Sequence, residues 1–266
     1  MARIKNARVV VTGASSGIGR AIAFEVARKG GNLILASPRL YSLRKVADEI
    51  QNTFADAPIP LAVSCDVTRR EDVARLIRIS ADHLGGIDIL INNAGIGVYG
   101  PSDKTSLEDF RSVMEVNFFG AVNCILEALP FMKKAGKGLV VNIASVAAKH
   151  GVPFLGAYSA SKAALAAFSQ SLRAELVSSG ISLMVVYPGY TQTEFFLKEK
   201  KVGGVHRPLG PYASVTKVSR AIVRAIEIEK RELVLSVQGK ALAFSQRLMP
   251  WLVERAMQRI AFQLKD

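Results

Sequence analysis

The stretch VVVTGASSGIGRAIAFEVA, residues 9–27, predicts a strand, a glycine-rich loop and a helix in direct succession. The β-branched residues come first, and Gly13, Gly17 and Gly19 follow with the spacing G-x-x-x-G-x-G. Such a loop turns tightly and brings backbone N–H groups to a pyrophosphate, and the helix that begins there adds the positive end of its dipole. The stretch therefore predicts a dinucleotide-binding unit near the start of the chain.

The rest of the chain continues to alternate apolar runs with helical segments, such as the 3.6-residue pattern of residues 71–85. Nearly continuous apolar strands that alternate with helices form a parallel sheet covered on both faces. With right-handed crossovers, the predicted fold class is α/β, a doubly wound parallel sheet of about seven strands with helices on both faces. The expected strands are residues 7–12, 32–36, 60–65, 87–92, 138–144, 182–187 and 232–237.

We expect a single domain over residues 1–266, because no Pro/Gly/Ser-rich linker, repeat or low-complexity stretch divides the chain. The most irregular segment, residues 190–215, follows a predicted strand end, where ligands of such sheets bind. A mobile substrate lid is one interpretation of this segment, and an ordinary surface loop with a short helix is the other.

The composition narrows the class of protein. Half of the residues are hydrophobic and 21% are charged, which allows a sizeable core and argues against disorder. The formal net charge of +13 favours anionic partners, but Lys and Arg are spread along the chain, so we expect no nucleic-acid binding. Cys65 and Cys124 stand singly in apolar runs, as buried reduced thiols do. We expect no metal site, because the chain's three histidines are scattered, at His83, His150 and His206.

The apolar run before the glycine loop is too short for a signal peptide or a transmembrane helix. No later segment offers eighteen uninterrupted apolar residues. We therefore expect a soluble cytoplasmic protein, or one that is at most peripheral to a membrane.

The end of the second predicted strand reads ASPRL, residues 36–40, at the position that selects between NAD and NADP. An acidic residue there binds the ribose 2′-OH of NAD and repels the 2′-phosphate of NADP. This chain has Ser37 at that position and Arg39 two residues later. Because an Arg pairs bidentately with a phosphate, we expect NADP(H) in preference to NAD(H). The other interpretation is that Arg39 is a solvated residue at the start of the next helix.

Two more strand ends carry residues for the same ligand. The sequence CDVT places Asp66 and Val67 after the third strand, where they would contact the adenine. The sequence INNAG places Asn93, Ala94 and Gly95 after the fourth strand, near the middle of the cofactor. The carboxyl ends of parallel strands share one edge of a sheet, so we expect all of these residues to meet there.

The pattern Tyr-x-x-x-Lys occurs twice in the sequence. Tyr41 and Lys45 directly follow the second strand, beside the expected adenosine end, and we interpret them as a solvated pair on an amphipathic helix. Tyr158 and Lys162 come after the fifth strand and Ser145. A helix that begins shortly before Tyr158 puts positions i and i+4 on one face, so this second pair is predicted to point into the cleft.

The second pair suits proton transfer to or from a carbonyl oxygen. A tyrosine with its ordinary pKa of about 10 is a poor base at neutral pH, but the Lys162 ammonium and an oxidised nicotinamide would favour the Tyr158 phenolate. Ser145 would hold and polarise the substrate oxygen, and Lys162 could also bind the nicotinamide ribose. Asn117 lies in an otherwise apolar helix, where it is either a structural amide or a group that positions water for a proton relay to Lys162.

Seven elements follow one another along the chain: TGASSGIG, CDVT, NNAG, Asn117, Ser145, YSASK and PGYTQT. In this order and spacing they resemble the short-chain dehydrogenase/reductase family over about residues 5–237. The resemblance implies a Rossmann-type domain that binds a nicotinamide dinucleotide. It implies that Asn117, Ser145, Tyr158 and Lys162 form the catalytic tetrad, and that the protein is a homodimer or homotetramer.

The same resemblance implies that Pro188, Gly189 and the turn after them line the nicotinamide, with Thr193 reaching its carboxamide. Together with the residues above, the expected cofactor-binding set is Gly13, Ser15, Ser16, Gly17, Ile18, Gly19, Ser37, Arg39, Asp66, Val67, Asn93, Ala94, Gly95, Tyr158, Lys162, Pro188, Gly189, Thr191 and Thr193.

The chain departs from the family pattern in two places. Many members that use NADP have a basic residue just before the second loop glycine, where this chain has Ser16, a difference that speaks against NADP. Bacterial 3-ketoacyl-carrier-protein reductases, which the chain otherwise resembles, end in a glycine-rich strand and a short tail. This chain instead continues for nearly thirty residues.

This extension, residues 238–266, is predicted to be an amphipathic, basic helix that is interrupted or begins at Pro250. It could pack on the substrate cleft or on a partner subunit, dock on anionic lipid beside Trp251, or be buried in the core. Its apolar positions are Leu248, Leu252, Ala256, Ile260 and Leu264, and Arg247, Arg255 and Arg259 lie among them.

The leading hypothesis is a carbonyl reductase or alcohol dehydrogenase that uses NADP(H). The apolar sequence EFFL, residues 194–197, favours an apolar small-molecule substrate that is lipid-, steroid- or ketoacyl-like. Two other classes remain open: a dinucleotide-sensing protein without turnover, and a membrane-surface adaptor that works through its C-terminal helix. The presence of both Ser145 and Tyr158 favours the enzyme, because a protein that only binds a dinucleotide needs neither.

Overall fold

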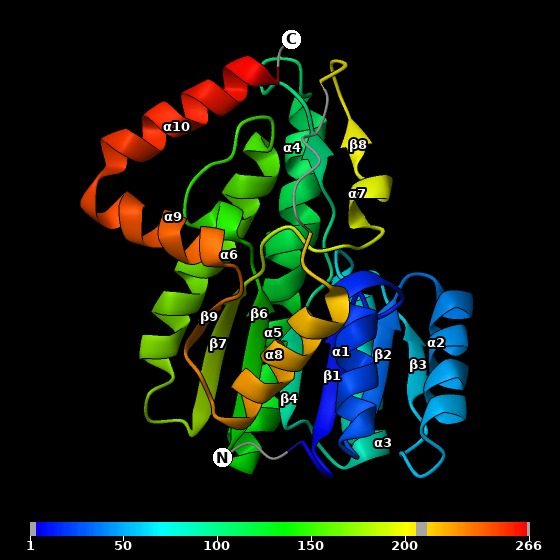
Figure 1. The fold of residues 1–266 in the computed structure, drawn as a ribbon. Helices are drawn as coiled ribbons and strands as arrows, with labels where there is room; N and C mark the ends of the chain where they lie inside the picture. Colours follow the sequence, from blue (N-terminus) through cyan, green and yellow to red (C-terminus); the bar gives the residue numbers. More distant parts are fainter. Residues whose placement is uncertain (1–3, 206–211, 265–266) are drawn as a thin grey trace.

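The structure, a computed structural model, describes residues 4–205 and 212–264. It contains a seven-stranded sheet in the order β3-β2-β1-β4-β6-β7-β9, in which every pair of neighbours is parallel (Figure 1). The predicted doubly wound α/β fold is therefore confirmed. The strands are β1 (Arg8–Thr12), β2 (Asn32–Ser37), β3 (Leu61–Ser64), β4 (Ile89–Asn92), β6 (Gly138–Ile143), β7 (Ile181–Tyr187) and β9 (Glu232–Val234).

Helices cover both faces of the sheet, and each face has its own apolar core. Along β1, the side chains of Val9 and Val11 enter one core and that of Val10 enters the other, as the two-residue repeat of a strand requires. The first core contains α1 (Gly17–Arg28), α2 (Leu40–Thr53) and α8 (Val215–Glu227), and the second contains α3 (Arg70–Leu84), α5 (Gly120–Ala135) and α6 (Gly156–Glu175).

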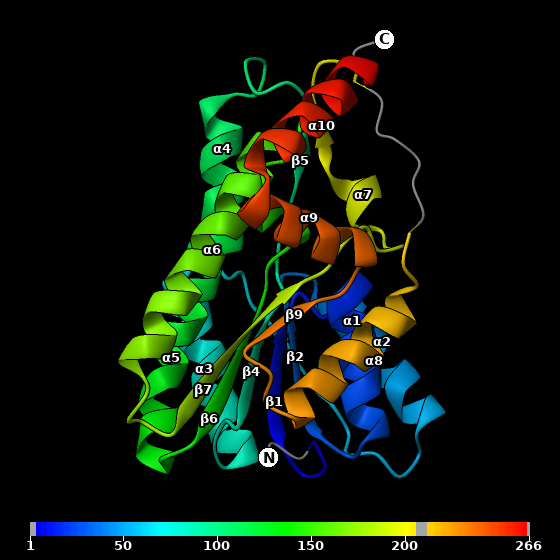
Figure 2. The same ribbon diagram turned by 60° about the vertical axis from the view of Figure 1, so that its left-hand side comes forward.

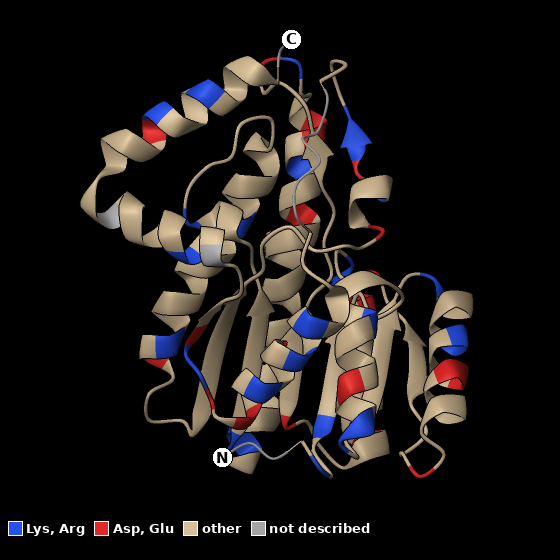
Figure 3. Cartoon of the chain, viewed as in Figure 1, with Lys and Arg blue, Asp and Glu red and all other residues tan. Residues whose placement is uncertain are grey.

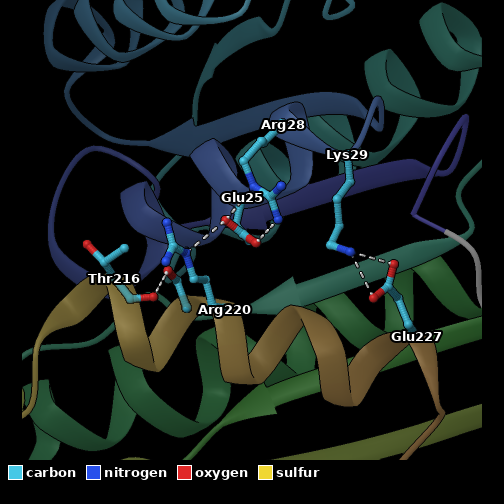
Figure 4. Close-up of polar contacts among 7 residues, drawn as sticks. Glu25, Arg28, Lys29, Thr216, Arg220 and Glu227 are labelled. Atoms are coloured by element: carbon cyan, nitrogen blue, oxygen red, sulfur yellow. Dashed lines mark hydrogen bonds and ion pairs between the residues drawn. The ribbon is translucent and has the colours of Figure 1, made fainter.

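Ion pairs join α1 to α8, two helices that lie far apart in the sequence (Figure 4). The Lys29 ammonium is 3.0 Å from both carboxylate oxygens of Glu227, and the buried Glu25 accepts hydrogen bonds from Arg28. The Arg220 guanidinium approaches Glu25 from α8 at 3.9 Å. These contacts hold α8 beside the helix that begins at the glycine loop.

Basic residues are distributed over several elements. Figure 3 shows Lys and Arg on α1, α2 and α8 and on the C-terminal helices, interspersed with acidic residues. The net charge of +13 is therefore spread over the surface, as the sequence indicates.

One long helical segment passes from α4 (Leu107–Met114) through a π-helical turn (Glu115–Phe119) into α5. By length and composition alone, residues 107–135 are apolar enough to cross a membrane. In the fold, however, α4 and the π-helical turn pack against α6, α5 packs against α3, and 44% of the apolar window is buried. The segment therefore belongs to the helical layer that covers one face of the sheet.

The segment predicted as a lid, residues 190–215, contains regular structure. The short helix α7 (Phe195–Lys198) is followed by β8 (Lys200–Lys201), which pairs in parallel with β5 (Val98–Tyr99). Residues 206–211, which include His206, lie outside the described part of the chain. Movement of this segment stays a prediction.

The C-terminal extension consists of two helices, α9 (Val237–Leu248) and α10 (Pro250–Gln263), separated at Met249. The predicted interruption at Pro250 is confirmed, because proline is the first residue of α10. The predicted strand 232–237 ends early, at Val234, because Ser236 caps α9 by accepting a hydrogen bond from the Gly239 N–H at 2.8 Å. The interpretation that the extension is buried in the core is wrong, because Val253 is the one buried residue among the described side chains of α10.

Candidate active site

A cavity of about 560 Å³ lies at the carboxyl ends of the strands. The ends of β1, β2, β3, β4, β6 and β7 all contribute to its wall, as expected for a doubly wound sheet. The sequence-predicted site residues that line it are Gly13, Ser15, Ser16, Gly17, Ile18, Ser37, Arg39, Asp66, Val67, Asn93, Ala94, Gly95, Ser145, Tyr158, Lys162, Pro188, Gly189, Thr191 and Thr193. Gly19 and Asn117 are the two predicted residues that stand behind the wall.

The glycine loop connects β1 to α1 through two left-handed residues, Gly13 with φ +63° and Gly17 with φ +56°. A Cβ at Gly13 would lie 2.8 Å from the Cα of Ala94, so the loop can approach the end of β4 only with glycine there. The first turn of α1 has no side-chain cap, because the Ser16 side chain accepts no hydrogen bond from it. No side chain therefore occupies the N–H groups at this helix start, and Ser16, Gly17 and Ile18 line the cavity, as a pyrophosphate site at a helix N-terminus requires.

Gly19 lies behind the glycine loop, where it leaves room for the Gly13 carbonyl and the Asn93 amide. A Cβ at this position would lie 2.5 Å from the carbonyl oxygen of Gly13 and would collide with the Asn93 amide. That amide donates hydrogen bonds to the carbonyl oxygens of Thr12 and Gly13, at 3.1 and 3.2 Å. Sequence reasoning missed Thr12, whose Oγ1 accepts from the N–H groups of Asn93 and Ala94 at 3.0 and 3.1 Å. These bonds tie the glycine loop to the end of β4.

The end of β2 forms one end of the cavity. Ser37 is buried, and its Oγ accepts a 3.3 Å hydrogen bond from the Arg39 N–H. The Arg39 side chain is exposed at the rim, immediately before α2. Both interpretations of Arg39 fit this position, because the residue is solvated and also reaches the cavity.

Asp66 follows β3 in a turn that its own side chain closes. Its Oδ1 accepts hydrogen bonds from the Thr68 N–H at 3.0 Å and from the Thr68 hydroxyl at 2.8 Å. The Asp66 N–H donates a hydrogen bond to the Asp72 carboxylate. This bond is the main reason that the pKa of the Asp72 carboxyl is lowered, and a hydrogen bond from the Arg75 side chain is the second. The turn thereby fixes the position of Asp66 and Val67 in the cavity wall.

Tyr158 and Lys162 lie one turn apart near the start of α6, and both line the cavity. The Lys162 side chain is 4% exposed, and its ammonium donates a 2.9 Å hydrogen bond to the carbonyl oxygen of Ile143 at the end of β6. Burial lowers the pKa of Lys162 to about 8, because the charged form loses hydration. The ammonium lies 5.8 Å from the centroid of the Tyr158 ring.

The other Tyr-x-x-x-Lys pair has nearly the same internal geometry. The Lys45 ammonium lies 5.6 Å from the centroid of the Tyr41 ring, but Tyr41 is 74% exposed and both residues lie outside the cavity wall. The two pairs therefore differ in surroundings and not in spacing. The prediction that Tyr41 and Lys45 form a solvated pair is confirmed.

Ser145 lies just beyond β6 and lines the cavity, as Lys162 does. Its side chain is 9% exposed, and its Oγ accepts a 3.2 Å hydrogen bond from the Ala147 N–H at the start of a 3₁₀ turn (Val146–Ala148). Because this contact uses the oxygen as an acceptor, the hydroxyl proton can be donated toward the cavity.

Asn117 is buried in the π-helical turn between α4 and α5. Its Oδ1 accepts from the Ile96 N–H at 2.8 Å, and its Nδ2 donates to the Ile96 carbonyl at 3.0 Å and to the Ser161 hydroxyl at 2.9 Å. The amide thus joins the loop after β4 to α6. A Cβ at Gly95 would lie 3.1 Å from Asn117 Oδ1 and 3.5 Å from Lys162 Nζ, so the three residues are close neighbours.

The far wall of the cavity is aromatic and comes mainly from the segment 190–215. Phe195 packs against Tyr158 with ring centroids 5.6 Å apart, and Phe196 lies between Phe195 and Tyr190 at 5.6 and 5.8 Å. The apolar sequence EFFL indicated part of this wall. The buried Glu199 also lines it, and the sequence contains no signal for that residue.

The residues present fit a nicotinamide dinucleotide. The glycine cradle, the uncapped helix N-terminus and the buried lysine lie along a single cavity that extends from β2 to β7. Among residues 4–205 and 212–264, no group of three or more His, Cys, Asp or Glu side chains could hold a metal ion.

Comparisons with known proteins agree with this geometry. A family model described as short chain dehydrogenase matches residues 7–202. The ketoacyl reductase HetN of a Nostoc species is 32% identical over 236 residues, which cover 89% of this chain and 80% of that protein. A short chain dehydrogenase of Burkholderia cenocepacia, solved in complex with NADP, is 25% identical with a TM-score of 0.83, covering 96% of this chain and 99% of that one.

A Burkholderia phymatum short chain dehydrogenase/reductase, solved in complex with NAD, has the same fold. Its TM-score is 0.84 at 24% identity, covering 95% of this chain and 96% of that one. The fold thus occurs with either dinucleotide. With its glycine loop, its cavity and the match over residues 7–202, the chain belongs to the short-chain dehydrogenase family of oxidoreductases.

Proposed function

We propose that this protein is a carbonyl reductase or alcohol dehydrogenase that prefers NADP(H) and acts on an apolar small molecule. The observation that carries the proposal is that Ser145, Tyr158 and Lys162 line the same cavity as the glycine loop, with the Lys162 ammonium 5.8 Å from the centroid of the Tyr158 ring. Lys162 hydrogen-bonds the carbonyl of Ile143, two residues before Ser145, so β6 aligns the two side chains.

When bound in this cavity, a reduced nicotinamide would supply the hydride that the carbonyl carbon accepts. The Tyr158 hydroxyl donates a proton to the carbonyl oxygen as the alcohol forms, and the same group accepts that proton in the reverse direction. The Ser145 hydroxyl holds the oxygen through a hydrogen bond, and the Lys162 ammonium stabilises the Tyr158 phenolate. Asn117 is a positioning residue, since it fixes the loop at Ile96 next to Lys162.

The exposed Arg39 at the rim of the cavity near β2 supports the preference for NADP(H). The Glu194 carboxyl has a lowered pKa, chiefly because Lys198 donates a hydrogen bond to it, with smaller contributions from Arg39 and Arg20. A 2′-phosphate beside Arg39 would pair with its guanidinium. Ser37 presents no carboxylate that would repel it.

The aromatic wall supports an apolar substrate. Phe195 and Phe196 line the cavity next to Tyr158, so a flat or aliphatic ketone would remove apolar surface from water there.

The proposal includes a homodimer or homotetramer that forms through α5 and α6. Leu126 is 54% exposed on α5, Phe131 is 38% exposed on the same helix, and Val177 beyond α6 is 85% exposed. Burial of these side chains between copies would stabilise the assembly, and light scattering of the purified protein tests it. The free buried thiols Cys65 and Cys124 support a cytoplasmic location.

A panel of aliphatic, aromatic and quinone carbonyls, assayed with NADPH and with NADH, tests the proposal. We expect oxidation of NADPH by apolar members of the panel and a lower rate with NADH. An absence of turnover across the panel together with tight dinucleotide binding would instead support a dinucleotide-sensing protein.

A further inference from the structure

The two C-terminal helices form an arch that stands out from the body of the protein (Figures 1 and 2). Seventeen large apolar side chains are exposed in the described residues, and seven of them lie between Phe244 and Phe262. A cluster of this size on a soluble domain marks an interaction surface.

The outward face of α10 combines aromatic and basic side chains. Trp251 is 56% exposed and Phe262 is 71% exposed, and Arg255 and Arg259 are exposed between them. The Arg255 guanidinium lies 5.5 Å from the centroid of the Trp251 ring. The opposite face of the helix holds Val253, Met257, Ala261 and Leu264, which are buried or half-buried.

The outward face of α9 continues the same pattern. Lys240, Phe244 and Leu248 follow one another at intervals of four residues, and all three are exposed. Both helices therefore expose large apolar side chains and cations. We name this set of exposed residues the arch face and define it as Lys240, Phe244, Leu248, Trp251, Arg255, Arg259 and Phe262.

The charge of the arch decides between possible partners. Residues 236–264 contain one acidic residue, Glu254, against four basic ones: Lys240, Arg247, Arg255 and Arg259. A second copy of the chain would bring the same cations against themselves across a two-fold axis, and the approach would be repulsive. Trp at the headgroup level with Arg and Lys beside it is the composition that an anionic bilayer surface favours.

We propose that the arch face docks on the surface of an anionic lipid bilayer. The rings of Trp251, Phe244 and Phe262 would enter the boundary between headgroups and acyl chains, and Arg255 and Arg259 would bind lipid phosphates. The arch is also joined to the cavity, because Ala261 and Leu264 pack against the cluster of Tyr99, Phe154 and Leu155, and Leu155 lines the cavity. On the basis of the proposed function, docking would place the substrate end of the cavity next to lipid-like ketones dissolved in the bilayer.

The chain carries its own reporter for this proposal, since Trp251 is its only tryptophan. The full-length protein is mixed with vesicles of phosphatidylcholine alone and with vesicles that also contain phosphatidylglycerol. We expect Trp251 emission to shift to the blue and the protein to sediment with the anionic vesicles, at least about tenfold more tightly than with the neutral ones. High salt should reverse the binding. Equal binding to both vesicle types, or to neither, would overturn the proposal.

Two pairs of variants test which residues are responsible. Arg255→Glu with Arg259→Glu should abolish binding to the anionic vesicles, whereas Arg44→Glu with Lys45→Glu, at exposed positions of α2, should leave it intact. Phe244→Ser with Phe262→Ser should weaken binding, whereas Ile59→Ser, which is 75% exposed elsewhere, should not. Dinucleotide affinity, measured on every variant, reports intact folding independently of turnover.

Equal loss of binding in the arch and control variants would contradict the assignment of the surface. If Phe244→Ser with Phe262→Ser converts an oligomer to monomers and wild-type protein ignores vesicles, the arch face is an interface between copies and the proposal is wrong. Failure of the carbonyl panel with intact vesicle binding would contradict the proposed function alone.

Discussion

The ammonium nitrogen of Lys162 donates a 2.9 Å hydrogen bond to the carbonyl oxygen of Ile143 from a position that is 4% exposed. A cation is unfavourable there, which is why burial lowers the pKa of Lys162 to about 8. A fold that retains such a group loses stability, so the lysine is expected to serve the site and not the core.

The first prediction follows from the stability that is lost when the Lys162 ammonium is buried. Lys162→Met should abolish turnover and should stabilise the protein by up to about 3 kcal/mol at pH 7, since the pKa is lowered from 10.5 to about 8. The unfolded chain binds more protons than the native state between those two values, so wild-type stability rises with pH from about 8 to 10.5 and the advantage of the variant shrinks. Urea unfolding at pH 7 and pH 10 measures both effects.

The matched control is Lys45→Met, in the exposed Tyr41–Lys45 pair with the same spacing. It should change stability by less than about 0.5 kcal/mol and leave turnover intact. Destabilisation by Lys162→Met across the whole pH range would show that the Ile143 hydrogen bond outweighs the cost of burying the charge.

The second prediction concerns Gly19. In most helices a change from glycine to alanine is favourable by about 1 kcal/mol. At Gly19 the added methyl would lie 2.5 Å from the carbonyl oxygen of Gly13, so we expect Gly19→Ala to lower the melting temperature and to weaken dinucleotide binding at least about tenfold. Gly151→Ala is the control, because its Cβ would meet no atom within 4 Å. Equal behaviour of the two variants in thermal melts and dinucleotide titrations would contradict the packing argument.

The third prediction concerns the choice of cofactor. Arg39→Ala should raise KM for NADPH by about 10- to 100-fold and leave KM for NADH nearly unchanged, because only NADPH carries the phosphate that the guanidinium would bind. Arg44→Ala, at an exposed position of α2, should change neither value. Equal effects of Arg39→Ala on both cofactors would contradict the binding of the 2′-phosphate by Arg39.

The fourth prediction concerns acid stability. Burial alone would raise the pKa of Asp88, but the Arg8 side chain and N–H donate three hydrogen bonds, at 2.7 to 3.0 Å, and bring it down to about 2. The native state therefore gains stability above the unfolded-state pKa near 4 and loses it as the pH falls toward 2. Asp88→Asn should cost about 1 to 2 kcal/mol at pH 7, a difference that narrows below pH 4.

Unfolding at pH 7 and pH 3 tests this prediction against Asp56→Asn at an exposed position, which should have little effect. A constant difference between Asp88→Asn and wild type at both pH values would mean that the carboxylate charge is not the source of the stability.

Much of the site could be predicted from local sequence, because its parts stand at strand ends. The glycine loop, Asp66, Asn93 and Ser145 each follow an apolar strand, and a parallel sheet brings such ends to one edge. The choice between two identical Tyr-x-x-x-Lys patterns also followed from position along the chain, since Tyr158 comes after Ser145 and Tyr41 does not.

Other features depend on tertiary contacts that no local pattern encodes. The π-helical turn at Asn117 is stabilised where the amide meets Ile96 and Ser161, which lie 21 and 44 residues away. Thr12 looks like one more β-branched strand residue, yet its hydroxyl accepts the two N–H groups after β4. The inward face of α10 differs from the predicted apolar stripe, because Val253, Met257 and Ala261 are buried or half-buried, whereas the predicted apolar positions Leu252, Ala256 and Ile260 are exposed.

The central claim is that Tyr158 exchanges the proton with the substrate oxygen, and Tyr158→Phe tests it most directly. The variant removes one hydroxyl from a ring that packs against Phe195 and keeps the ring itself. Turnover of NADPH with the best carbonyl of the panel is measured beside NADPH affinity by titration. We predict a loss of turnover of at least about 100-fold, within the usual contribution of a general acid, with NADPH affinity unchanged within about threefold. Turnover equal to that of the wild type in a variant that still binds NADPH would contradict the account.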